Sequence, residues 1–330
     1  MSVDFFLYIS LIFFGAIYTF NHSKKIFFLY FSFLLIFIVA IRMDPKGVDF
    51  VTYYQYLHNV DGIRYYREVV YFSIGLGFFK LFNDEVITFI FMDFIWIYIL
   101  FKIQKEINLK FNTTDNVLIV ILFTSFPLFF GYENIYRQLF AEIFSLYAYV
   151  VRERNESKSN FLFLIAILMH NTALIILPFL LIKKISKLDF KTRLYISTIV
   201  SIVFGLLLSF MSQYKASAHN TGLDMAFIYY LLFFMLNYIY LIKNKFNIVR
   251  VVEKFPSIYL GLILMTFLIQ LPVGMISERI GMFFLVFVIT DLYIYSINMT
   301  TFRKKLFRLG LLMIFSLPVI AFTSSRVMLL

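Results

Sequence analysis

Long apolar stretches separated by short polar segments recur along the whole 330-residue chain. Examples are the runs 3–20, 161–182, 194–211 and 225–242. Each run is close to the roughly 20 residues that an α-helix needs to cross a bilayer core of about 30 Å. This pattern predicts an all-α, polytopic membrane protein.

Charged and turn residues divide the chain into twelve apolar segments, which need not all be membrane spans. The segments lie near 3–20, 26–41, 70–82, 86–101, 117–132, 139–151, 161–182, 194–212, 225–242, 257–276, 280–299 and 309–325. We expect about 10–12 transmembrane helices in a single integral membrane domain that covers residues 1–330.

The count of lysine and arginine distinguishes two topologies, because loops on the inner side of a membrane carry more of them. If all twelve segments cross, with Lys24 and Lys25 inside, the inner loops carry 16 basic residues and the outer side carries 13. The counts become 21 and 8, with Lys80 counted on neither side, if 70–82 is a short re-entrant or juxtamembrane segment and 161–182 is broken near His170 and re-enters. We therefore prefer the second topology.

The preferred topology has a consequence for function. It places the loop 42–68, the turn around Arg137 and the turn around Arg279 together on the outer face of the membrane. Candidate functional residues are therefore expected on that face, at the depth of the lipid headgroups.

The composition excludes a soluble globular protein. Hydrophobic residues make up 62% of the chain and charged residues 15%, whereas about a quarter of a typical soluble domain is charged.

The first apolar run has Asp4 instead of a basic segment before it and no small-residue cleavage site, so we expect a retained helix rather than a signal peptide.

Composition also limits the ligands that we expect. The chain has no cysteine and four scattered histidines, so we predict neither disulfides nor a metal site nor another cofactor. The net charge of +11 comes mostly from basic clusters between apolar runs. Topology explains such clusters, so a nucleic-acid partner is not expected.

The outer loop carries the first candidate residues. A glycine beside Asp49 offers a flexible backbone next to a carboxylate, and rings that follow, such as Tyr53, could stack on the faces of sugars. Arg42 opens the loop, and Arg67 with Glu68 closes it. The simpler interpretation of each charge is an ordinary solvated loop.

Two arginines lie where apolar segments begin. Arg137 and Gln138 precede one segment, and Glu142 lies one turn inside it, where an ionisable group costs about 2.5–3.5 kcal/mol and commonly marks a partner or a pathway. Arg279 follows Glu278 between two apolar runs. Either guanidinium could bind a phosphate through its planar fork. The alternatives are an arginine that snorkels to headgroups and a surface ion pair.

A polar spot interrupts the apolar segment 161–182. His170 and Asn171 lie in its middle, eight and seven residues before Pro178. A lone histidine in a membrane is often only hydrogen-bonded to a neighbouring helix, but His170 with Asn171 and Thr172 at a helix break forms a more polar spot than packing needs.

Taken in order, these motifs resemble the EpsG-like, Wzy-type polysaccharide polymerases, over about residues 40–285. The motifs are Gly47-x-Asp49 followed by tyrosines, Arg67-Glu68, Ile-Tyr-Arg137-Gln138 with Ala141, Met-His170-Asn171-Thr-Ala, and Glu278-Arg279-Ile280.

The resemblance implies a membrane fold related to the GT-C glycosyltransferases and polymerisation of O-antigen, capsule or exopolysaccharide. The donor would be an undecaprenyl-pyrophosphate-linked glycan, and the acceptor the next lipid-linked repeat unit. The implied location is the bacterial plasma membrane, with the active site facing the periplasm or cell exterior. Membrane lipids and a chain-length regulator of the same pathway are the further partners expected.

The implied chemistry assigns roles to the candidates. Displacement at an anomeric carbon needs a base near the incoming hydroxyl and positive charge on the leaving pyrophosphate. We expect Asp49 as the base, with His170 as a positioning group or the alternative base, and Arg137 and Arg279 on the pyrophosphate. The expected substrate-binding residues are Arg42, Tyr53, Arg67, Glu68, Gln138, Glu142, Asn171 and Glu278.

Two other functions stay open on the sequence alone. A flippase or exporter of lipid-linked oligosaccharides also needs basic residues in a cavity, but we find no internal repeat of the kind such transporters carry. A membrane O-acyltransferase of polysaccharides would also use a histidine. Only the order of the motifs argues against an O-acyltransferase.

Overall fold

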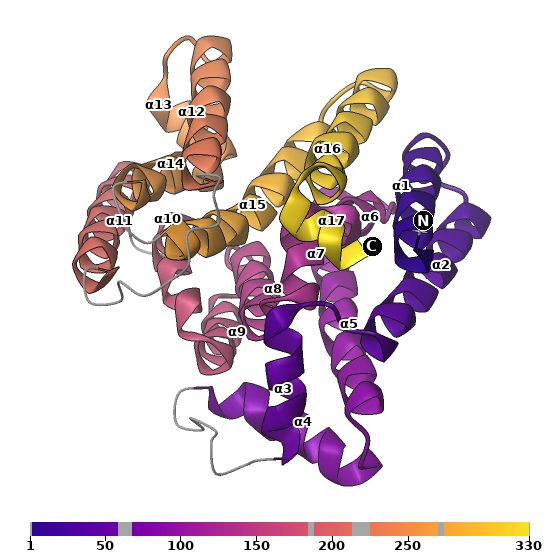
Figure 1. Ribbon diagram of the computed structural model, residues 1–330. Coiled ribbons are helices and arrows are strands. Elements are labelled where there is room, and N and C mark those ends of the chain that lie inside the picture. The colour runs from indigo at the N-terminus through magenta and orange to yellow at the C-terminus, as the bar shows by residue number, and fades with distance from the viewer. Residues whose placement is uncertain (1, 59–67, 184–187, 213–224, 270–273, 330) are drawn as a thin grey trace.

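The computed structural model describes residues 2–58, 68–183, 188–212, 225–269 and 274–329, which form 17 α-helices and one 3₁₀ helix (Figure 1). In chain order these are α1 (Val3–Phe20), α2 (Lys24–Met43), α3 (Val48–His58), α4 (Val69–Phe82), α5 (Glu85–Phe111), α6 (Val117–Thr124), α7 (Phe126–Glu133), α8 (Tyr136–Val151), α9 (Glu156–Met169), η3 (Asn171–Ile176), α10 (Leu177–Lys183), α11 (Phe190–Ser212), α12 (Met225–Lys243), α13 (Ile248–Lys254), α14 (Pro256–Leu268), α15 (Gly274–Ile297), α16 (Thr301–Ala321) and α17 (Thr323–Leu329). The described ranges contain no strand.

Short polar residues set several of the helix boundaries. The Asp84 side chain accepts a hydrogen bond from the backbone N–H of Ile87 (2.8 Å) at the start of α5. Asn155 caps α9 in the same way. Asn83 and Asn112 end α4 and α5 with φ angles of 49° and 51°. This left-handed conformation is one that asparagine tolerates better than most residues.

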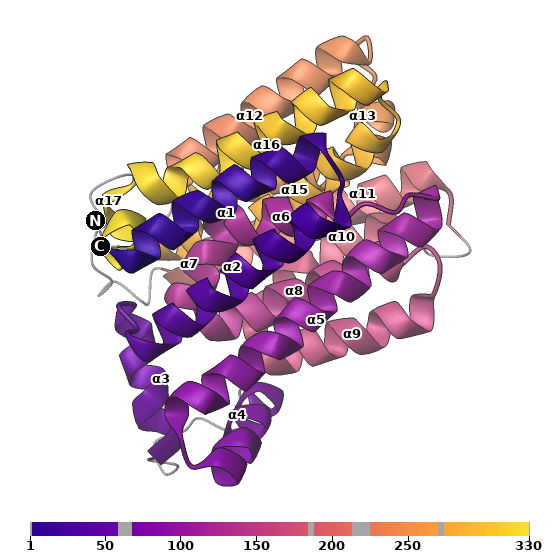
Figure 2. The ribbon, with the colours of Figure 1, turned by 90° about the vertical axis from the view of Figure 1, so that its right-hand side faces the viewer.

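Long helices run side by side, and both ends of the chain lie at one end of the bundle, at the left in Figure 2. We call this the termini end. There the Ser2 hydroxyl donates a hydrogen bond to the backbone carbonyl of Leu329. At the opposite end, the backbone N–H of Asn116 donates to the Tyr18 hydroxyl (3.2 Å) and so joins α1 to the start of α6.

The inter-helix loops named below lie at one or the other of these two ends. At the termini end, Glu68 contacts Arg137, and Gln138 contacts the backbone of Arg279. At the opposite end, contacts join the α5–α6 region to the α8–α9 turn and to the start of α16. They are Arg154 with Glu106, Lys110 with Glu153, and Arg308 with Asp115. This grouping agrees with the preferred topology, in which the same loops share a face.

The Arg308–Asp115 pair holds the opposite end together. Arg308 is fully buried and donates to the Asp115 carboxylate at 2.9 Å. The Tyr293 hydroxyl donates to the same carboxylate at 2.6 Å. Burial alone would raise the pKa of Asp115, but Arg308 and Tyr293 outweigh it and hold that pKa below its usual value. Asp115 therefore stays ionised at neutral pH.

Five helical segments in the described ranges are individually long and apolar enough to cross a membrane: Val3–Phe20, Lys24–Met43, Glu85–Phe111, Phe190–Leu208 and Ser277–Ile297. A bent pair within α12 and α13, with an angle of 117° at the break, would add a sixth. Shorter or interrupted apolar helices occupy the other predicted segments. The prediction of an all-α, polytopic membrane protein is confirmed, whereas 10–12 spans stay a prediction.

The segment 161–182 is broken at His170, and the chain turns back there. At the start of this segment the Ser159 hydroxyl bonds to the Ala148 carbonyl (2.8 Å) near the last turn of α8. After the break, α10 brings the Lys183 ammonium to 3.9 Å from the Tyr149 ring centre, again near the last turn of α8. The stretch from α9 to α10 thus rises along α8 and returns, which is the re-entrant course that the charge count favours.

The described part of the region 42–68, which comprises residues 42–58 and Glu68, is largely helical rather than the predicted loop. Helix α2 continues to Met43, and α3 spans 11 residues. A Cβ atom on Gly47 would lie 1.7 Å from the backbone oxygen of Glu133, so only glycine allows this approach. The expected flexibility at Gly47 was wrong. Close packing between the α2–α3 connection and the end of α7 requires this glycine instead.

The face that α3 buries explains why this region is helical. Phe50, Tyr53 and Leu57 are all buried and follow one another at intervals of three and four residues. This spacing places them on one side of a helix. They pack against α4 and α5 at the termini end, where α4 (14 residues) occupies the predicted non-spanning segment.

Candidate active site

Glu68 is the centre of a polar cluster at the termini end. Its Oε2 atom accepts a hydrogen bond from Arg137 Nη1 at 2.5 Å. Its Oε1 atom lies 3.4 Å from His170 Nε2. The three residues come from the start of α4, the first turn of α8 and the break after α9. The fold therefore brings together three residues that the sequence separates widely.

The histidine has a defined orientation. His170 caps η3, and its Nδ1 atom accepts a hydrogen bond from the backbone N–H of Thr172 at 3.2 Å. The Thr172 hydroxyl lies 2.9 Å from the same nitrogen. Because Nδ1 is an acceptor, the proton of the neutral ring is on Nε2, which faces Glu68. His170 is thus placed to orient the Glu68 carboxylate.

Arg137 keeps part of its side chain accessible. Its side chain is 31% exposed, whereas that of Glu68 is 10% exposed. The guanidinium carbon lies 5.3 Å from the centre of the Tyr53 ring, a cation–π contact that fixes one face of the group. Arg137 also lies in the first turn of α8, where the helix dipole adds partial positive charge. An anionic ligand would meet favourable charge from both sources.

A backbone contact places the second predicted arginine nearby. The Gln138 side-chain amide donates a hydrogen bond to the carbonyl oxygen of Arg279 at 2.9 Å. The Ser277 hydroxyl donates to the carbonyl of Leu268 at 2.8 Å and fixes the start of α15 against the end of α14. Glu278 and Arg279 are half-buried in this first part of α15. The starts of α8 and α15 are therefore direct neighbours, as a shared substrate site requires.

Two further predicted residues flank the cluster. Glu142 lies one turn after Gln138 on α8 and is 2% exposed, and its Oε1 atom has no hydrogen-bond partner among the residues that the structure describes. Asn171 is exposed next to His170. Their binding roles stay predictions.

Arg42 has a different environment from Arg137. Its guanidinium is fully buried, donates two hydrogen bonds to Asp93 (2.7 and 2.9 Å) and a third to the Tyr132 carbonyl (2.9 Å). The rings of Phe50 and Tyr136 pack on it, with their centres 4.1 and 4.8 Å away. No face of the group is left for a substrate. The structure therefore favours a structural role over the substrate-binding role expected from the sequence.

The sequence analysis did not select Asp93, which the structure shows to be a central residue. Besides Arg42, the Trp96 indole N–H (2.8 Å) and the Tyr136 hydroxyl (2.7 Å) donate to its carboxylate. A signal was present, because Asp93 is an acidic residue inside a long apolar run, and such residues nearly always have a partner. Tyr136 directly precedes Arg137, so this network also fixes the start of α8.

Two predicted residues cannot be placed. Arg67 lies outside the described residues. The backbone of Asp49 lies in the first turn of α3, but its side chain is outside the described part of the structure. Across the part of the chain that is described, no group of three or more His, Asp or Glu side chains could hold a metal ion.

Comparison with known proteins identifies a family. No curated protein and no solved structure matches the chain, so a relation to the GT-C fold stays a prediction. The family model described as the EpsG family matches residues 25–328, which include the α4, α8, α9 and α15 residues of the cluster. The chain belongs to the EpsG family.

Proposed function

We propose that this protein polymerises undecaprenyl-pyrophosphate-linked repeat units into O-antigen, capsule or exopolysaccharide chains. Membership of the EpsG family supports a role of the polysaccharide-polymerase type. The observation that carries the finer proposal is the Arg137–Glu68–His170 cluster, in which a partly exposed cation and a buried carboxylate lie side by side at one end of the bundle.

The reaction is a glycosyl transfer. The bond between the anomeric carbon of the growing glycan and the pyrophosphate oxygen breaks, and that carbon forms a bond to a hydroxyl oxygen of the next repeat unit. The hydroxyl proton passes to a base, and the lipid pyrophosphate leaves with the bonding electrons. Catalysis therefore needs a base at the hydroxyl and positive charge at the pyrophosphate.

The cluster supplies these groups. Arg137 binds the pyrophosphate through its accessible side, and Arg279 on the neighbouring helix adds a second guanidinium. Glu68 lies next to Arg137 and is oriented by His170, so we propose Glu68 as the base. Asp49, the base expected from the sequence, is the competing candidate. His170 keeps the positioning role in both versions.

We further propose that the termini end faces the periplasm or cell exterior of a bacterial plasma membrane. The support is the basic-residue count of 21 on the loops of one side and 8 on those of the other. The chain has no cysteine, so single cysteines can report the sides. Cysteines at Lys46 and Asn134 should react with an impermeant thiol reagent from outside, whereas those at Asn112 and Asn247 should not. Labelling of Asn112 together with protection of Asn134 would reverse the assignment.

Glycolipid analysis of a deletion strain tests the function itself. A polymerase defect removes long chains and leaves glycans with a single repeat unit on the surface. Loss of all repeat units from the surface would indicate the flippase or exporter alternative. Chains of normal length that lack acyl groups would indicate the O-acyltransferase alternative.

A further inference from the structure

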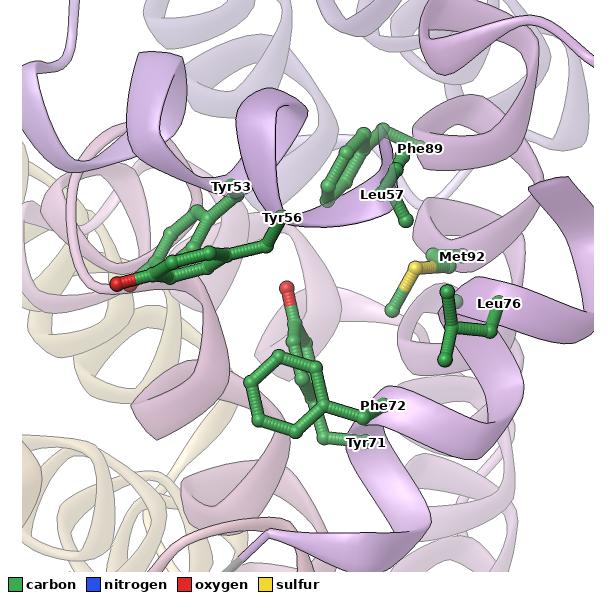
Figure 3. A pocket seen from close by; sticks show the side chains of 9 residues that line it. Tyr53, Tyr56, Leu57, Tyr71, Phe72, Leu76, Phe89 and Met92 are labelled. Atoms are coloured by element: carbon green, nitrogen blue, oxygen red, sulfur yellow. The ribbon is translucent and has the colours of Figure 1, made fainter. Parts of the chain in front are cut away.

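Two hollows in the structure differ greatly in size. The aromatic space between α3, α4 and α5 (Figure 3) holds about 10 Å³, which is room for one water molecule and for no organic ligand. A groove of about 600 Å³ lies at the opposite end of the bundle, against the last part of α5 and the α5–α6 connection. This volume is within the range of about 300–1,000 Å³ that ligand sites occupy. None of the functions proposed above uses the groove.

One face of α5 forms much of the groove. Tyr98, Phe101, Lys102, Lys105 and Leu109 line it, at the i, i+3, i+4, i+7 and i+11 positions of a single helix face. Figure 2 shows α2 and α5 alongside each other as they run to the opposite end. The groove thus has a long side that follows the axis of α5.

An aromatic contact fixes one wall of the groove. The Phe101 ring packs against two rings of α2, with its centre 6.2 Å from that of Phe27 and 5.6 Å from that of Phe31. Both contacts are edge-to-face, the arrangement that aromatic pairs prefer. The wall between α2 and α5 is therefore built from interlocked rings.

The two lysines in this face have no carboxylate partner. In the described part of the chain, neither Lys102 nor Lys105 forms an ion pair, and the groove lining contains no Asp or Glu. The nearest acid along α5, Glu106, binds Arg154 and Lys158 instead, at 2.9 Å each. The groove therefore carries two positive charges that the protein itself does not neutralise.

The position of the lysines along α5 matches the depth of lipid phosphates. Lys102 and Lys105 follow Glu85, the first residue of α5, by 17 and 20 residues, which is about 26 and 30 Å along the helix axis. The hydrocarbon core of a bilayer is about 30 Å thick. A helix that enters the core at the acidic residues Asp84 and Glu85 therefore brings these lysines to the far boundary of the core.

The groups before and after the lysines also follow the order of a phospholipid. Toward the middle of the bilayer, the rings of Phe94 and Tyr98 are 45% and 56% exposed and lie four residues apart on α5. Beyond the lysines, Asn112 and Thr114 line the groove with exposed polar side chains. The surface changes from apolar to cationic to neutral and polar along one direction.

We infer that the groove binds one anionic glycerophospholipid in the leaflet at the opposite end. The lipid phosphate lies on the ammonium groups of Lys102 and Lys105, an acyl chain covers Tyr98 and Phe94, and the head group reaches Asn112 and Thr114. In the orientation proposed above, this is the cytoplasmic leaflet. The site is separate from the Glu68 cluster and does not require the protein to be a polymerase.

The sequence of groups favours an anionic phospholipid over two other occupants. A soluble phosphate compound would leave the exposed rings on the membrane side of the lysines uncovered. A zwitterionic lipid such as phosphatidylcholine carries its own cation, which would repel the two lysines and leave their charge unneutralised. An anionic lipid satisfies both the rings and the lysines.

The chain offers matched pairs of variants. Lys102→Gln with Lys105→Gln removes both charges from the groove, and Lys102→Arg with Lys105→Arg keeps them. Lys304→Gln with Lys305→Gln removes the same charge at the same end of the bundle, from the first turn of α16, outside the groove. All four lysines are at least partly exposed, so each variant should keep the melting temperature of the wild type.

Titration of phosphatidylglycerol into the purified full-length protein in a non-ionic detergent, followed by native mass spectrometry, tests the inference. The wild type should bind its first phosphatidylglycerol about 10-fold more tightly than phosphatidylcholine, because only the former neutralises the lysines. Lys102→Gln with Lys105→Gln should weaken phosphatidylglycerol binding about 10- to 30-fold. The arginine pair and the Lys304/Lys305 glutamine pair should bind as the wild type does.

Several results would overturn the inference. Unchanged affinity in Lys102→Gln with Lys105→Gln would place the lipid elsewhere, and an equal loss in both glutamine pairs would reduce the effect to the net charge of this end. Equal binding of phosphatidylcholine would remove the role of the lysine charges. Displacement of the lipid by an equal concentration of inorganic phosphate would assign the groove to a soluble anion. The assay contains no transfer step, so none of these results bears on polymerisation.

Discussion

Two arginine–carboxylate pairs at the termini end have similar chemistry and opposite surroundings. In the pair of Arg42 with Asp93, the side chains are 0% and 1% exposed and two hydrogen bonds join them. In the pair of Arg137 with Glu68, the arginine side chain is 31% exposed and one hydrogen bond joins them. The first pair is enclosed by aromatic rings, whereas the second adjoins a histidine.

The two pairs differ in accessibility rather than in residue type, and on this ground we propose a structural role for the first and a functional role for the second. The two pairs are also linked, because Tyr136 donates to Asp93 and directly precedes Arg137. The Arg42–Asp93 pair thus holds the start of α8 in place, and this fixes the position of Arg137 in the second pair. The two should respond differently to the same substitutions.

The largest expected effect is on folding, from Arg42→Ala. The change leaves the Asp93 carboxylate buried without its cation, which typically costs about 3–5 kcal/mol. We expect little folded protein in the membrane and a lower melting temperature in detergent. The double variant Arg42→Met with Asp93→Leu is the control and should recover part of the loss. Wild-type abundance and melting temperature in Arg42→Ala would show that the pair is dispensable.

The second largest effect is expected from Arg137→Ala, which should lose activity but keep its fold. Removal of a charge that stabilises the leaving group should reduce polymerisation about 100-fold or more, while abundance stays near normal because the side chain is accessible. Arg137→Lys should rescue poorly, since lysine lacks the planar fork. Chain-length analysis of complemented deletion strains at matched protein levels measures both.

Arg279→Ala is predicted to remove long chains as well. Long chains of wild-type length in either alanine variant would remove that arginine from the site.

Comparison of Glu68→Gln with Asp49→Asn identifies the base. Removal of a general base typically lowers the rate about 10²- to 10⁴-fold, and we expect this loss in Glu68→Gln. Turnover of lipid-linked repeat units by purified protein is the measurement. A nearly active Glu68→Gln beside an inactive Asp49→Asn would restore the assignment made from the sequence. Activity in both would place the base elsewhere.

The smallest effects concern the group that orients Glu68. His170→Ala loses the Nε2 donor, and we expect about a 10-fold fall in turnover from one hydrogen bond to a carboxylate. His170→Gln can place an amide donor near the same point and should recover part of the activity. Thr172→Val keeps the backbone N–H that bonds to Nδ1 and should change turnover little. An inactive His170→Gln beside a fully active Glu68→Gln would make the histidine the base.

Much of the helical architecture followed from the sequence, because long apolar runs have few alternatives in a membrane. The break at His170 could also be predicted, since polar residues within an apolar run are costly in an uninterrupted span. The charge count correctly grouped the loops that meet near Glu68, Arg137 and Arg279. Periodicity and charge are local quantities that a single sequence carries.

The sequence could not assign partners. Whether Arg42 faces a substrate or Asp93 depends on how α2 and α5 pack, and no local pattern encodes this. Glycine at position 47 suggested flexibility, although its real cause is the backbone of Glu133 from a distant segment. The buried face of α3 was present in the spacing of Phe50, Tyr53 and Leu57, but polar residues at both ends of the region hid it.

The contact between Ser2 and Leu329 limits how many times the chain can cross the membrane. Ser2 and Leu329 touch and must therefore lie on the same side of the bilayer, so the chain crosses the bilayer an even number of times between them. Any topology with an odd count contradicts this contact, whatever the assignment of individual helices. Reporter proteins fused to the two ends should accordingly give the same compartment signal, and a split reporter should reassemble across them.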